Sequence, residues 1–254
     1  MSHPSVAEIR AANASLKDHG FFLRTIRPLG PYCAWVGLRL GLRPIQLNFF
    51  NFALALFCCG LLALGPASAR VPAAILLLIW QTLDVTDGTM ARTLGIRSNY
   101  GGFVDHLAGI FLIAFFCISV GLGLYLHPEG SVTAALESAN IRFDYDPAYS
   151  LILGAYSSVA AILMRLTQRI VQVRFGTDPV TEDVAPDGSI ISRGLGLVRD
   201  LENIGGYFLI VFFAAVLLGK LEWFILFYFL VYAAMLAGAT AQVFRSLRER
   251  HDYL

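Results

Sequence analysis

The chain has 254 residues, of which 57% are hydrophobic and only 15% are charged, and its formal net charge is +1. Soluble domains carry about 25% charged residues, so this composition argues against a soluble fold. The first 20 residues lack the apolar core of a signal peptide. We expect a membrane protein with no nucleic-acid partner.

The amino-terminal segment precedes any long apolar run. Residues 21–43 alternate apolar and basic positions, and Pro28 and Pro31 interrupt them. The pattern predicts an amphipathic helix on the cytoplasmic membrane surface, with its arginines facing anionic headgroups. A solvated basic arm is the alternative. We assign residues 1–46 to a cytoplasmic or interfacial segment.

Six apolar runs follow, and a helix needs about 20 such residues to cross about 30 Å of hydrocarbon. The runs cover, approximately, residues 47–64, 71–92, 101–126, 149–171, 204–218 and 223–244. They predict an all-α, polytopic membrane protein of about six transmembrane helices, with a transmembrane domain over 47–246 and a cytoplasmic tail over 247–254. We read residues 127–147 as an acidic external loop and the long polar stretch 174–202 as a cytoplasmic loop.

The distribution of basic residues predicts the orientation. Of the 19 lysines and arginines, all but Arg70, Arg142 and Lys220 lie in the amino-terminal segment, in alternate connections or in the tail. Because basic loops stay in the cytoplasm, both termini are expected there. We expect an integral protein of a bacterial inner membrane.

A charged patch interrupts the apolar pattern at residues 81–109. It holds Asp84, Asp87 and Asp105, with two arginines and a histidine. Ionisable residues at membrane depth are costly and are therefore candidates for function. Asp84 and Asp87 would share one helix face, and an antiparallel hairpin would bring Asp105 beside them. A structural ion-pair cluster that closes a loop is the alternative.

Three carboxylates in a partly dry site repel one another and require a cation. Oxygen ligands favour Mg²⁺, Mn²⁺ or Ca²⁺ over zinc, and Mg²⁺ commonly shares its remaining positions with substrate phosphates. Arg92 could bind a phosphate through two hydrogen bonds. Small residues in the patch would let a bulky ligand approach the backbone. These residues are Gly88, Ala91, Gly101 and Gly102. The patch predicts a metal-dependent site for a diphosphate, near the cytoplasmic face.

The residues of this patch also form a recognisable pattern. They read Asp84-x-x-Asp87-Gly88-x-x-Ala91-Arg92, then eight residues, then Gly101-x-x-x-Asp105. This pattern resembles the signature of the CDP-alcohol phosphotransferases, also called CDP-alcohol phosphatidyltransferases. The six-span topology extends the likeness over most of the chain.

The resemblance implies an activity and a set of roles. A CDP-linked donor binds in a polar cavity, an alcohol attacks the phosphorus bonded to the donor's alcohol moiety, and CMP leaves. At least one of the two substrates would be a lipid, and a homodimer is expected. The implied ligands of Mg²⁺ or Mn²⁺ are Asp84, Asp87 and Asp105. The implied contacts to the CDP moiety are Gly88, Ala91, Arg92 and Gly101.

Gly109 departs from the family pattern, which has another aspartate four residues after Asp105. In the family that aspartate is a metal ligand or the base for the attacking alcohol. The number of bound metal ions, one or two, therefore stays open. His106 directly follows Asp105, as in the choline and ethanolamine phosphotransferase branch. Histidine suits general-base work near neutral pH, so we expect His106 and Asp105 to serve catalysis. An interfacial histidine that bonds a backbone carbonyl is the alternative.

A second departure lies at the entry to the first run, where the family often has Pro-Asn. This chain has Pro44-Ile45 there, with Asn48 and Asn51 nearby. Farther along, three charged residues at the end of the long loop could contact a headgroup or be ordinary interfacial charges: Arg193, Arg199 and Glu202.

Two donor classes fit the resemblance. CDP-diacylglycerol would pass a phosphatidyl group to a small polar alcohol, and a CDP-linked polar alcohol would donate its headgroup to a lipid hydroxyl. Two other functions are weighed against the enzyme. A catalytically silent relative would bind a nucleotide-lipid or act as a membrane scaffold, and a channel or transporter would carry charges along a path rather than at one membrane face.

Overall fold

The computed structural model describes residues 4–14, 25–96, 99–141, 145–175 and 207–249. Every regular element in these ranges is a helix. An apolar chain in hydrocarbon must satisfy its backbone N–H and C=O groups internally, and a helix does so within one segment. The predicted all-α fold is confirmed.

Five of the described helices are long and apolar enough to cross a membrane. Their bounds are α4 (Pro44–Leu64), α5 (Arg70–Thr93), α6 (Asn99–Leu126), α8 (Pro147–Phe175) and α11 (Leu221–Glu249). A 3₁₀ turn, η2 (Ala67–Ala69), joins α4 to α5. Large apolar side chains such as Phe57, Ile79 and Phe227 are exposed on these helices. Such a surface suits contact with lipid, and the chain is a polytopic membrane protein.

The remaining expected span, residues 204–218, is described only from Tyr207 onward. There the short helix α10 (Leu209–Leu217) contributes buried side chains to the main hydrophobic core. Its Phe212 meets Phe116 of α6 edge to face, with ring centroids 4.8 Å apart. Aromatic pairs favour this geometry, so α10 is held by packing with its long neighbours.

Glycines let α6 approach two neighbouring helices closely. A Cβ at Gly123 would collide with the backbone oxygen of Leu62 on α4. A Cβ at Gly154 of α8 would likewise collide with the backbone oxygen of Cys117, and it would lie 3.1 Å from the Cα of Gly121. Close approach of backbones through small residues is a common mode of helix packing in membranes.

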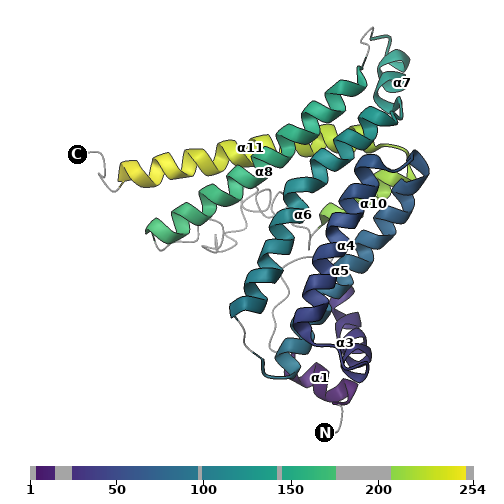
Figure 1. Ribbon diagram of the computed structural model, residues 1–254. Helices are drawn as coiled ribbons and strands as arrows, with labels where there is room; N and C mark the ends of the chain where they lie inside the picture. The colour runs from purple at the N-terminus through teal and green to yellow at the C-terminus, as the bar shows by residue number, and fades with distance from the viewer. Residues whose placement is uncertain (1–3, 15–24, 97–98, 142–144, 176–206, 250–254) are drawn as a thin grey trace.

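The amino-terminal segment packs against one end of the bundle (Figure 1). Its elements are α1 (Val6–Ala12), the 3₁₀ turn η1 (Arg27–Leu29) and α3 (Gly30–Arg39). Where the sequence predicted one surface helix over residues 21–43, the described residues form two short elements, η1 and α3. Each has a proline in its first turn, a position that favours the start of a helix. Ile9 of α1 is 0% exposed and lies in a cluster with Leu38 and Met90, so this segment is anchored to α5.

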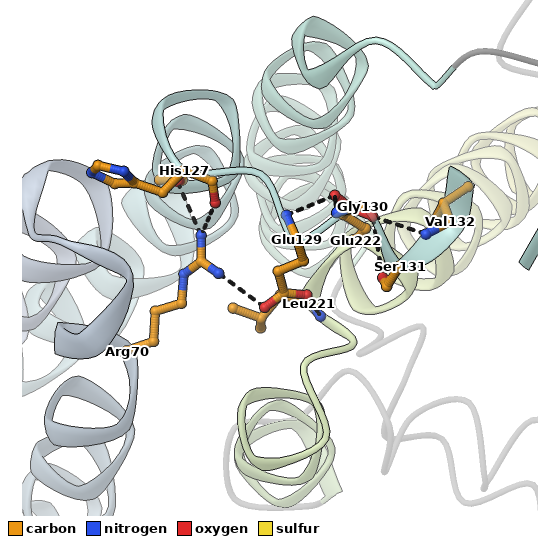
Figure 2. Close-up of polar contacts among 9 residues, drawn as sticks. Arg70, His127, Glu129, Gly130, Ser131, Val132, Leu221 and Glu222 are labelled. Carbon is orange, nitrogen blue, oxygen red and sulfur yellow. Dashed lines mark hydrogen bonds and ion pairs between the residues drawn. The ribbon is translucent and has the colours of Figure 1, made fainter. Parts of the chain in front are cut away.

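The opposite end carries α7 (Ser131–Ser138), a helix within the stretch expected to be an external loop. Figure 2 shows how it is fixed. The carboxylate of Glu222 at the start of α11 accepts hydrogen bonds from the backbone N–H groups of Glu129, Gly130 and Val132, at 2.8–3.0 Å. Arg70 of α5 forms an ion pair with Glu129 at 2.9 Å. Three helices are thus tied together at this end.

Candidate active site

The polar patch lies near the end of α5 and the start of α6, at the end of the bundle that carries α1 and α3 (Figure 1). Asp84 and Asp87 lie on α5, and Asp105 lies on α6. The two consecutive helices pack against α4 rather than closely against each other, and the three aspartates that they carry lie within electrostatic range of one another.

Asp84 and Asp105 face each other from the two helices. Their carboxyl groups interact directly, and Asp87 lies within electrostatic range of both. Carboxylates so placed repel one another. A divalent cation between them would offset this repulsion.

Asp87 supplies a further oxygen to the same place. Its side chain is 5% exposed, and Oδ2 has no hydrogen-bond partner among the described residues. Buried polar atoms are nearly always bonded, so an unpartnered carboxylate oxygen suits a ligand. Within the described part of the chain, no three His, Cys, Asp or Glu side chains lie close enough together to hold a metal ion by themselves. An open, oxygen-only donor set still fits Mg²⁺ or Mn²⁺, which take further ligands from water and phosphates.

The threonines around these aspartates do not compete for them. Thr82, Thr86, Thr89 and Thr93 each donate a hydroxyl hydrogen bond to the carbonyl four residues earlier in α5, at 2.7–2.9 Å. This mode of bonding is common for threonine within helices. It satisfies the hydroxyl groups internally and leaves the carboxylates for another partner.

Arg92 lies directly over Gly88. A Cβ at Gly88 would come 3.0 Å from Nη1 and 3.2 Å from Nη2 of Arg92, so the glycine provides the space in which the guanidinium rests. The guanidinium is also within electrostatic range of Asp87 and Asp105. Arg92 is exposed and Ala91 is half-buried. An anion that reaches the carboxylates with its cation would therefore meet this guanidinium.

Gly101 connects the start of α6 to α4. Its carbonyl oxygen accepts a hydrogen bond from Asn48 Nδ2 at 3.4 Å. The Oδ1 atoms of Asn48 and Asn51 are buried, and neither has a hydrogen-bond partner among the described residues. Polar residues inside an apolar run are candidates for function. The sequence analysis noted Asn48 and Asn51 but assigned them no role.

His106 is exposed on α6. Adjacent helical positions point in different directions, so the Asp105 and His106 side chains do not share a face. In the described part of the chain, His106 is within electrostatic range of Asp105. One turn beyond Asp105, a Cβ at Gly109 would meet no atom within 4 Å. The position of the missing aspartate therefore has room for a side chain.

Asn13 is a residue that sequence reasoning missed. Its Oδ1 accepts a hydrogen bond of 2.6 Å from Arg92 Nε, although the two residues are 79 positions apart. No local pattern marks such a contact. The three expected headgroup contacts fall outside the described residues: Arg193, Arg199 and Glu202.

Comparison with known families agrees with this geometry. The family model for CDP-alcohol phosphatidyltransferases matches residues 42–175, which is more than half of the 254-residue chain. The match spans α4 to α8 and so includes both helices that carry the aspartates. No curated protein matches the chain.

Proposed function

Because the chain belongs to the CDP-alcohol phosphatidyltransferase family, we propose that it transfers a substituted phosphate group from a CDP-linked alcohol to an alcohol acceptor in phospholipid biosynthesis. CMP is the second product. The observation that carries the proposal is the approach of Asp84 and Asp105 to each other beside the buried Oδ2 of Asp87, which has no hydrogen-bond partner among the described residues. Carboxylates in this arrangement suit a divalent cation and, with it, a diphosphate.

In the proposed reaction, the acceptor hydroxyl oxygen forms a bond to the phosphorus that carries the donor's alcohol moiety. The bond between that phosphorus and the oxygen of CMP breaks, and CMP leaves with the electron pair. The hydroxyl proton passes to a base, for which we propose His106. Mg²⁺ or Mn²⁺ held by Asp84, Asp87 and Asp105 would stabilise negative charge on the diphosphate.

The remaining residues of the signature position the donor in this proposal. Arg92 binds a diphosphate oxygen through its terminal amino groups, because the guanidinium fork matches phosphate geometry. Gly88, Ala91 and Gly101 leave space for the CDP moiety beside the helix backbones. Arg193, Arg199 and Glu202 are proposed contacts to a headgroup.

Orientation and assembly follow from the basic residues and the family. We place both termini and the site at the cytoplasmic face of the membrane, in keeping with the distribution of lysine and arginine. A homodimer is expected from the family resemblance alone.

The test is CMP release by the purified full-length protein in lipid nanodiscs with Mg²⁺ or Mn²⁺. One arm supplies CDP-diacylglycerol with small polar alcohols, and the other supplies CDP-choline or CDP-ethanolamine with lipid acceptors. Release in one arm identifies the donor class. We expect EDTA and Asp84→Asn each to abolish release, whereas Glu137→Gln, an exposed carboxylate of α7 at the opposite end, retains it.

A silent relative gives a different result. It would bind CDP-lipid and release no CMP in either arm, and the absence of an aspartate at Gly109 would then be its simplest cause. Solute flux in liposomes without CMP release would instead support a transporter and reject the enzyme.

A further inference from the structure

The amino-terminal helix α1 makes one direct contact with the candidate active site. Asn13, the residue that ends α1, accepts a hydrogen bond from Arg92 Nε through Oδ1 at 2.6 Å. The contact joins a residue ahead of the family match, which begins at residue 42, to the arginine of the signature. Nothing in the shared pattern accounts for this contact.

The orientation of the Asn13 amide is fixed by its other bonds. Nδ2 donates to the carbonyl oxygen of Ile9 at 2.9 Å, to Thr93 Oγ1 at 3.4 Å and to the carbonyl oxygen of Thr89 at 3.5 Å. If the amide oxygen and nitrogen were exchanged, the NH₂ group would face the N–H donor of Arg92, and the amide oxygen would face the carbonyl oxygens of Ile9 and Thr89. The oxygen must therefore face Arg92.

The end of α1 that carries Asn13 is packed and hydrogen-bonded against α5. Ile9, one turn before Asn13, is 0% exposed and lies in a cluster with Leu38 and Met90. Asn13 also bonds two residues of α5, Thr89 and Thr93. The amide oxygen is thus held relative to the helix on which Arg92 sits.

The consequence is a guanidinium fixed from two sides. Nε donates a hydrogen bond to Asn13. The terminal nitrogens lie beside Gly88, where a Cβ would come within 3.0–3.2 Å of them. Nη1 and Nη2 are thereby left for a ligand, within electrostatic range of Asp87 and Asp105. An arginine that is already oriented loses less side-chain entropy when it binds a phosphate.

We propose that Asn13 is a positioning residue, which orients Arg92 so that its terminal amino groups receive the diphosphate of a CDP-linked ligand. The proposal rests on the proposed function, because a diphosphate must bind at this site. It assigns to α1 a part in donor affinity. It also predicts that the oxygen of Asn13 and its nitrogen have separable roles, since Oδ1 orients Arg92 and Nδ2 docks α1.

The test compares two substitutions of Asn13 in the full-length protein. Asn13→Asp keeps an oxygen for Arg92 and loses the docking nitrogen, whereas Asn13→Leu loses both. We would measure the dissociation constant of CDP in the presence of Mg²⁺, with the thermal midpoint of each variant. We expect both variants to melt earlier, but only Asn13→Leu to weaken CDP binding by about tenfold. Asn13→Asp should stay within about threefold of the wild type.

The matched control is Arg10→Gln. Arg10 also tethers α1, through a 2.6 Å hydrogen bond to the hydroxyl of Tyr32 on α3, but it is not bonded to Arg92. Its loss should leave CDP affinity unchanged. A second check is Arg92→Lys, which lacks Nε; in this background Asn13→Leu should have no further effect on CDP affinity.

Two results would overturn the proposal. Equal weakening by Asn13→Asp and Asn13→Leu would mean that Asn13 only docks the helix, and unchanged affinity in Asn13→Leu would mean that Arg92 needs no support. These results differ from a failure of the proposed function, in which the wild-type protein itself neither binds CDP nor releases CMP.

Discussion

Glu129 and Glu222 are 93 residues apart; Glu222 binds the backbone of Glu129, and Glu129 binds the backbone of Leu221, the residue next to Glu222. Glu222 Oε1 accepts the N–H of Glu129 at 3.0 Å, and Glu129 Oε2 accepts the N–H of Leu221 at 2.8 Å (Figure 2). Burial raises the pKa of the Glu129 carboxyl, and the Leu221 N–H and Arg70 oppose this shift. The pair fixes the starts of α7 and α11 at the end of the bundle remote from the aspartates.

Loss of Glu222 should therefore destabilise the fold without altering the active site. Glu222 is 2% exposed. Glu222→Ala would leave the backbone N–H groups of Glu129, Gly130 and Val132 without the carboxylate to which they donate. An unpaired buried donor costs about 1–3 kcal/mol, so we expect a loss of roughly 2–4 kcal/mol and a lower midpoint in thermal unfolding. Glu137→Gln on the exposed face of α7 is the control and should melt as the wild type does. Lower CDP affinity in Glu222→Ala at a temperature where it is folded would contradict the separation of the two ends.

The close contact between α4 and α6 leads to a second stability prediction. In Gly123→Ala the new methyl group would collide with the carbonyl oxygen of Leu62, so the helices must separate, at a cost of about 1–3 kcal/mol. Gly60→Ala, on α4, is the matched control because a Cβ there meets no atom within 4 Å. Thermal unfolding in the same detergent would compare the two variants. Equal midpoints would show that the contact can relax at no cost.

Hydrophobic runs predicted most of the membrane helices because burial in lipid demands them. The predicted runs 47–64, 71–92 and 101–126 agree with α4, α5 and α6 to within three residues at each end. The last run, 223–244, is shorter than α11, because helical hydrogen bonding continues through polar residues that hydropathy excludes. α7 was missed, since its start is held by Glu222, about 90 positions away in the sequence.

The candidate site also has features that sequence spacing predicts and features that depend on tertiary packing. Spacing alone predicted that Asp84, Asp87 and Asp105 would come near one another. Helical periodicity places the first two on one face, and the next helix begins at the same end of the bundle. The contact between Asn13 and Arg92 could not be predicted, since it depends on how α1 docks on α5. Asp105 and His106 are adjacent in the sequence, but the helix turns adjacent side chains apart, so their joint role in catalysis stays a prediction.

Binding of a metal to the aspartates should be visible without any turnover. A ligand that binds only the folded state raises stability, by about 2.7 kcal/mol when its concentration is 100 times its dissociation constant. We expect Mn²⁺ or Mg²⁺ to raise the thermal midpoint of the wild-type protein and EDTA to reverse the rise. Asp87→Asn, which alters the carboxylate with the unpartnered oxygen, should abolish the effect. A rise of equal size in Asp87→Asn would place the metal elsewhere.

The proposed base gives a kinetic prediction. General-base catalysis contributes about 10²–10⁴ in rate, so His106→Gln should lower kcat about a hundredfold or more. CDP affinity should stay near that of the wild type. The control is His127→Gln, at the opposite end of α6, which should leave kcat unchanged. Near wild-type turnover in His106→Gln would reject His106 as the base.

Gly109→Asp tests whether the chain can accept the aspartate that its family pattern contains. A Cβ at Gly109 meets no atom within 4 Å, and residue 109 lies one turn after Asp105 on the same helix face. The substitution should therefore fold, and replacement of a glycine within a helix adds stability of its own. A fourth carboxylate should lower the Mn²⁺ concentration needed for half-maximal CMP release by about tenfold. Gly109→Asn has nearly the same size without the charge, and it should not produce this shift. Equal metal dependence of the Asp and Asn variants would show that a carboxylate at position 109 does not reach the metal, so that other groups complete the site in this protein.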